Sequence, residues 1–84
     1  MHPMIETELV RLVRLARSDT PEATRQVVRL RRTARHLRDD RAEVACLRLL
    51  ALLAKGSGNR VRASLHYEAI LRIRPGDVAA HLGL

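Results

Sequence analysis

The segment that most constrains the fold is Val44–Ala54, with the sequence VACLRLLALLA, in which Arg48 alone interrupts ten apolar residues. A helix that is apolar nearly all round has to be covered on more than one side. The segments before and after it carry apolar residues at helical spacing, and no segment shows the alternation of a half-buried strand. We therefore expect an all-α fold with this helix at its centre.

Length and composition limit what such a fold can be. A chain of 84 residues predicts one domain, which buries only about 60% of the surface of its unfolded chain. Tyr67 is the only aromatic residue, so the core has to be built from aliphatic side chains. Cys46 is the only cysteine, and its apolar neighbours favour a buried hydrophobe over a reactive thiol. No apolar run approaches the roughly 20 residues that cross a bilayer, and we expect a cytoplasmic protein.

The order of apolar stripes and turn residues predicts antiparallel helical hairpins. Gly56–Asn59 is a short turn, so the helices on either side of it should be antiparallel neighbours. Pro75 and Gly76 end the following helix. The expected elements are a first hairpin over residues 5–38, a second hairpin over residues 41–74 and a short C-terminal helix over residues 77–84.

Several residues are expected to mark the starts of these helices. The first helix should begin near Pro3, because proline suits the first helical turn. Thr20 is the expected cap of the second helix. Asp40, followed three residues later by Glu43, resembles a capping box at the start of the third. Asp77 is the expected cap of the short last helix.

The second helix is strongly basic. The net charge of the chain is +7, and all but one of its 16 basic residues are arginines. Two rows of arginine follow helical spacing along this helix, Arg25, Arg29 and Arg32 in one and Arg31, Arg35 and Arg38 in the other. One interpretation is a solvated outer face that is partly balanced by Glu22, Asp39 and Asp40. The other is a surface that binds an acidic partner.

Residues 44–77 carry the most specific pattern in the chain. The positions that form it are Leu47, Leu50, Gly58, Asn59, Ala63, Tyr67 and Pro75. In this order and spacing they resemble a tetratricopeptide repeat, a helix-turn-helix unit of about 34 residues. Residues 5–38 resemble a divergent repeat, and residues 78–84 the start of another. Because arrays of this kind need at least three units, the resemblance implies a homodimer, a partner that completes the array, or a longer protein of which this chain is a part.

The resemblance also implies protein binding through a groove lined by the first helix of each unit. The residues at the matching contact positions are Ala45, Arg48, Leu52 and Lys55. Arg48 either binds an acidic group in the groove or marks its exposed edge. The asparagine-rich carboxylate clamp of some family members is absent. The implied partner is an acidic or amphipathic helical segment, and the implied role is that of an adaptor or of a small chaperone like those of bacterial type III secretion.

Two other functional classes are less well matched by the residues. Nucleic-acid binding through the arginines of the second helix is the alternative, although one tyrosine does not supply the aromatic platforms typical of single-strand recognition. Catalysis is not expected, since no nucleophile, phosphate-binding loop or metal-ligand spacing is present, and no cofactor is predicted. The four histidines, His2, His36, His66 and His81, are scattered and are expected at the surface or at an interface.

Overall fold

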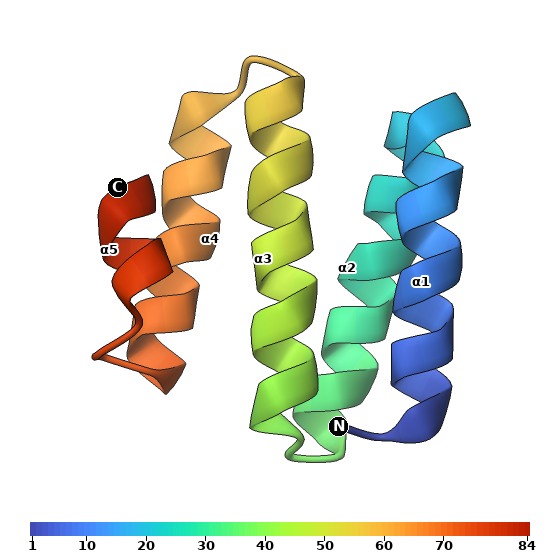
Figure 1. The fold of residues 1–84 in the computed structure, drawn as a ribbon, viewed down its shortest axis with the longest axis horizontal. Helices are drawn as coiled ribbons and strands as arrows, with labels where there is room; N and C mark the ends of the chain where they lie inside the picture. The colour runs from blue at the N-terminus through green and yellow to red at the C-terminus, as the bar shows by residue number, and fades with distance from the viewer.

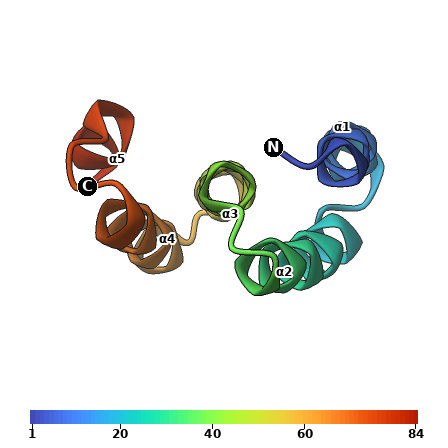
Figure 2. The same cartoon turned by 90° about the horizontal axis from the view of Figure 1, so that it is seen from below.

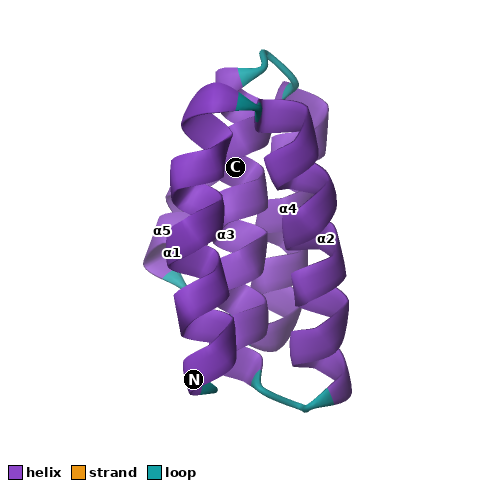
Figure 3. Ribbon diagram, turned by 90° about the vertical axis from the view of Figure 1, so that its right-hand side faces the viewer, coloured by secondary structure: helices purple, strands orange, loops and turns teal.

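The computed structural model covers residues 1–84 and consists of five α-helices without a strand, which confirms the all-α prediction (Figure 1). The helices are α1 (Pro3–Ser18), α2 (Thr20–His36), α3 (Asp40–Gly56), α4 (Arg60–Ile73) and α5 (Val78–Gly83). Consecutive helices run antiparallel and lie side by side, as Figure 3 shows from the α1 side of the molecule.

The five helices form a thin, curved array. Viewed along the helix axes, α3 lies in the middle, α2 and α4 lie on one side of it, and α1 and α5 lie on the other (Figure 2). We call the side of α1 and α5 the inner side. The molecule measures 30 × 27 × 16 Å, so its shortest dimension is less than two helix diameters. Such an array leaves a large part of every helix facing solvent.

The core follows α3 along both of its flanks. Leu47 and Ala51 of α3 pack with Tyr67 and Ile70 of α4 in the largest apolar cluster. On the opposite flank, two smaller clusters join α3 to α1 and α2, through Leu12, Val27, Cys46 and Leu50 in one and Ile5, Ala34 and Ala42 in the other. The central helix is therefore covered on two sides, as its composition predicts.

The caps of α2 and α3 correct two sequence predictions. Asp19, not Thr20, caps α2 by accepting a hydrogen bond from the backbone N–H of Glu22 at 3.1 Å. Asp39, not Asp40, caps α3 by accepting from Ala42 N–H at 3.1 Å. The capping residue needs non-helical backbone angles to aim its carboxylate back at the first turn, and the residues that follow these two aspartates are already helical.

The other helix starts agree with the sequence. Pro3 is the first residue of α1. Asp77 caps α5 through a 2.9 Å hydrogen bond from the backbone N–H of Ala80. Asn59 caps α4 in the same way, by accepting from Arg62 N–H at 3.0 Å. Short polar turns with these caps hold the helices antiparallel and close together.

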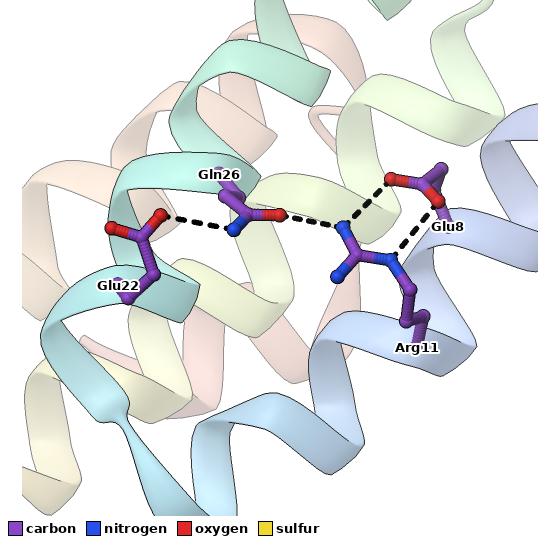
Figure 4. Close-up of polar contacts among 4 residues, drawn as sticks. All are labelled: Glu8, Arg11, Glu22 and Gln26. Atoms are coloured by element: carbon purple, nitrogen blue, oxygen red, sulfur yellow. Dashed lines mark hydrogen bonds and ion pairs between the residues drawn. The ribbon is translucent and has the colours of Figure 1, made fainter.

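A chain of polar side chains joins α1 to α2 on the surface (Figure 4). Arg11 donates two hydrogen bonds to Glu8, at 3.1 and 3.0 Å, and a third to the amide oxygen of Gln26. The amide nitrogen of Gln26 donates to Glu22 at 2.9 Å. The hydrogen bonds from Arg11 lower the pKa of Glu8. Exposed pairs of this kind contribute little stability, but they engage Nε and Nη2 of Arg11 in hydrogen bonds within the chain.

Candidate functional site

The inner side of α3 is its one open face. Ala45, Arg48 and Leu52 follow each other at spacings of three and four residues, so they share one side of the helix. Leu52 is 57% exposed, whereas Leu47 and Leu50 on the flanks are buried. Because α2 and α4 lie behind α3, this face looks toward the space between α1 and α5 (Figure 2). We call Ala45, Arg48 and Leu52 the inner face of α3.

Arg48 is engaged by the chain itself. Its guanidinium donates two hydrogen bonds to the carboxylate of Asp77, at 3.2 and 2.8 Å. The Asp77 side chain is only 10% exposed and that of Arg48 is 35% exposed. The hydrogen bond from Arg48, followed by the one from Ala80 N–H, lowers the pKa of Asp77 to about 2. Sequence reasoning placed Arg48 at a contact position and Asp77 at a cap, but it did not pair them.

Lys55 lies at the edge of the inner side and is directed toward α4. Its ammonium nitrogen is 5.2 Å from the ring centroid of the buried Tyr67, a cation–π distance. Lys55 also lines a cavity of about 560 Å³ at the end of the molecule where α4 begins and α5 ends. The other residues that line it are Gly58, Arg60, Ala63, Ser64, Gly83 and Leu84. Lys55 is therefore next to Tyr67 and α5, and it follows Leu52 by three residues in α3.

The six arginines predicted for the second helix separate into paired and unpaired groups. Five of them lie on α2, whereas Arg38 follows its end with a left-handed φ of 53°, so the predicted row of Arg31, Arg35 and Arg38 stops at Arg35. Arg25 pairs with Glu22 at 2.8 Å, and Arg31 pairs with Glu43 of α3 at 3.3 Å. The other four have no carboxylate within ion-pair distance, and all are exposed: Arg29, Arg32, Arg35 and Arg38. We call these four the basic face of α2. Their charges repel one another unless counterions or a partner cover them.

The carboxylates near the end of α2 do not balance these charges. Asp39 accepts hydrogen bonds from the backbone N–H groups of His2, at 2.8 Å, and Ala42, and these lower its pKa. Neither Asp39 nor Asp40 pairs with an arginine. Of the three expected counter-charges, only Glu22 has that role, because Asp39 is the cap of α3 and faces backbone N–H groups.

The outer side of α3 holds an ion pair that the sequence did not reveal. Glu43 is 8% exposed and accepts its hydrogen bond from Arg31. His66 of α4 is half-buried, and burial, together with the charges of Arg62 and Arg31, lowers its pKa. The spacing of Asp40 and Glu43 suggested a cap, whereas the apolar residues on both sides of Glu43 were the available signal of burial.

The remaining groups of interest are the cysteine and the side chains that could bind a metal ion. Burial, with a smaller effect of Glu43, raises the pKa of the Cys46 thiol to about 11, so the thiol is protonated at neutral pH. No three His, Cys, Asp or Glu side chains gather closely enough to hold a metal ion. None of the five helices combines the length and the apolar character that a membrane span requires.

Comparison with known proteins leaves the chain without an assigned family. No protein-family model, curated protein or solved structure matches it.

Proposed function

We propose that this chain is a non-catalytic protein-binding module of tetratricopeptide type, in which the inner side binds an acidic or amphipathic helical segment. The observation that carries the proposal is Leu52, a large apolar side chain left 57% exposed near the C-terminal end of α3, a helix with buried residues along both flanks. Helical grooves bind amphipathic helices through apolar anchors of this kind. The role is that of a cytoplasmic adaptor or a small chaperone.

The charge of the chain supports an acidic partner. The net charge is +7, and two cations of α3 are near Leu52 in the chain: Arg48, which binds Asp77, four residues before it, and Lys55, which lies over the Tyr67 ring, three residues after it. A basic surface attracts acidic segments over several ångströms and speeds their association, with an effect that weakens as salt is added. Leu52 would supply the apolar contact, and the flanking cations would select for acidic residues beside it.

The ends of the array support the idea that a further helix completes it. Val78 and Leu82 of α5 are 69% and 82% exposed, and Val61 and Leu65 of α4 are also open to solvent. Helical repeats bury such faces on the next unit. A second copy of the chain or a helical partner would cover them in the same way.

Nucleic-acid binding through the basic face of α2 is the second candidate. It is favoured by the four exposed arginines that have no carboxylate within ion-pair distance. Phosphate contacts by such residues give binding that falls steeply with salt and requires no apolar anchor. The two candidate functions depend on different residues on different helices, so substitutions at these residues can distinguish protein binding from nucleic-acid binding.

The test captures partners on immobilised wild-type protein and variants from nuclease-treated and untreated lysate of the native host. Leu52→Glu is the main variant, and Leu37→Glu is its control, because Leu37 is similarly exposed, at 54%, but lies beyond the end of α2. A defined protein captured by the wild type and by Leu37→Glu, but lost with Leu52→Glu, is expected. Binding that disappears with nuclease, or with Arg32→Glu and Arg35→Glu only, would instead assign the function to the basic face.

A further inference from the structure

The short helix α5 is held in place by few contacts. An isolated helix of six residues does not persist in water. Ala80 is the only residue of α5 that is buried, and most of the surface of Val78 and Leu82 faces solvent. The position of α5 therefore depends on what its two ends touch.

The first end is fixed by Asp77. Its carboxylate receives both hydrogen bonds from Arg48 on the inner face of α3 and also caps α5 through Ala80 N–H. One side chain thus starts the helix and ties it to the candidate site. Without the ion pair, no other hydrogen bond joins α5 or its cap to α3.

The second end is fixed by Gly83, which lies directly on the ring of Tyr67. A Cβ atom at this position would be 2.6 Å from ring carbons Cε2 and Cζ, closer than any real contact. The requirement for glycine comes from this approach and not from a left-handed backbone conformation, since only Arg38 and Gly58 have positive φ. The ammonium nitrogen of Lys55 lies 5.2 Å from the centroid of the same Tyr67 ring.

We propose that residues 75–84 are an internal ligand, which we call the strap, and that a partner helix displaces it from Arg48 and Tyr67. The inference rests on the proposed function, because the incoming segment is the same amphipathic helix. The strap indicates which residues the site at Arg48 and Tyr67 accepts. They are an acidic residue at the start of a helix and small residues three and six positions later, as in Asp77, Ala80 and Gly83. Ala80 and Gly83, three residues apart, are neighbours on the surface of the helix, and Asp77 caps its start.

Displacement of the strap uncovers the two groups that the partner needs. The guanidinium of Arg48 loses its internal carboxylate and becomes available to one from the partner. The ring of Tyr67 loses the contact with Gly83 and becomes available to a small residue of the partner. Pro75 and Gly76, both exposed and outside any helix, are the first residues of the strap and follow α4 in the chain. The closed strap lowers the apparent affinity of the site in proportion to the fraction of molecules that are open.

Opening of the strap can be followed through Tyr67, the only aromatic residue of the chain. Acrylamide quenching of tyrosine fluorescence is compared for the wild type, Gly83→Ala and Gly56→Ala. The control variant is matched because a Cβ at Gly56 meets no atom within 4 Å. We expect stronger quenching for Gly83→Ala, with helical circular dichroism nearly unchanged, and no change for Gly56→Ala. Equal quenching in all three proteins would overturn the proposal.

The binding half of the proposal is tested with a labelled peptide of residues 75–84, followed by fluorescence anisotropy. The peptide should bind Gly83→Ala more tightly than the wild type, because the strap of the wild type occupies the site at Arg48 and Tyr67. A peptide in which the aspartate is replaced by asparagine keeps the cap but loses the charge, and should bind about twofold to fivefold more weakly. Equal binding of the peptide to both proteins, or equal binding of both peptides, would contradict the internal-ligand assignment.

A second variant keeps the test valid if Gly83→Ala loses helical structure. Asp77→Asn retains a good capping residue and removes only the charge that Arg48 binds. It should raise both the quenching of Tyr67 and the binding of the peptide, and the absence of both effects would refute the strap.

If Leu52→Glu abolishes capture of the partner while Gly83→Ala and Asp77→Asn leave it unchanged, the proposed function is supported and the strap is refuted. If Leu52→Glu changes nothing, the proposed function fails first.

Discussion

Two leucines of α3, five residues apart, provide the strongest test of which face of the helix is open. Leu47 is 0% exposed within the largest apolar cluster, and Leu52 is 57% exposed on the inner face. The substitutions Leu47→Ala and Leu52→Ala remove the same atoms from the same helix and install the same residue with high helix propensity. Any difference in stability therefore reports the surroundings of the two side chains.

The expected magnitudes follow from burial. Leucine to alanine removes three carbon groups, which contribute about 2.4 kcal/mol when fully buried, at about 0.8 kcal/mol each. The cavity left at Leu47 raises the expected loss to about 3–4 kcal/mol. Because Leu52 is already 57% exposed, its truncation should cost at most about 1 kcal/mol. A domain of 84 residues has a total stability of about 4–13 kcal/mol, so the first loss is severe.

The assay is urea unfolding followed by far-ultraviolet circular dichroism, with thermal unfolding as a second measurement. Leu47→Ala should lower Tm by about 10–30 °C and Leu52→Ala by less than about 8 °C. Similar losses for both variants would mean that Leu52 is covered in solution, by self-association or by another helix. That result would refute the open inner face and, with it, the anchor on which partner binding is proposed to depend.

Three further predictions concern buried or half-buried polar groups. Glu43→Ala should destabilise the protein by about 1–3 kcal/mol, because it removes the buried acceptor of Arg31. Its control, Glu22→Ala at an exposed pair, should cost less than about 1 kcal/mol. Urea unfolding of both variants measures the difference. His66 should titrate below its ordinary pKa of 6.5 in an NMR titration. Since the folded state then binds fewer protons than the unfolded state, the stability due to neutral His66 is present above pH 6.5 and is lost as pH falls below it, a dependence that His66→Leu should remove. Cys46, with its pKa raised to about 11, should react with a disulfide reagent only as fast as the core opens, and a rate equal to that of an exposed thiol would contradict its burial.

Local chemistry was enough to predict the helices. The apolar run around Leu47 required a doubly covered helix, and the turns at Gly56–Asn59 and Pro75–Gly76 lie where α3 and α4 end. These features act over three or four residues, within reach of backbone hydrogen bonds and side-chain periodicity. Even so, the caps of α2 and α3 were each misplaced by one residue, because adjacent polar residues compete for the capping position and the backbone angles decide between them.

The pairings that form the candidate site were decided by tertiary structure. Arg48 and Asp77 are 29 residues apart in the chain, and Arg31 and Glu43 are on different helices. No periodicity connects such residues, because the first distance depends on how α5 packs on the array and the second on how α2 packs on α3. The sequence by itself determined that Arg48 lies on the open side of an apolar helix and that α2 is densely basic. Only the packing decided that Arg48 binds the chain's own carboxylate, that Lys55 lies over Tyr67, and that four arginines on and just after α2 form no ion pair. The reason is that ion pairing depends on which side chains the fold brings within a few ångströms.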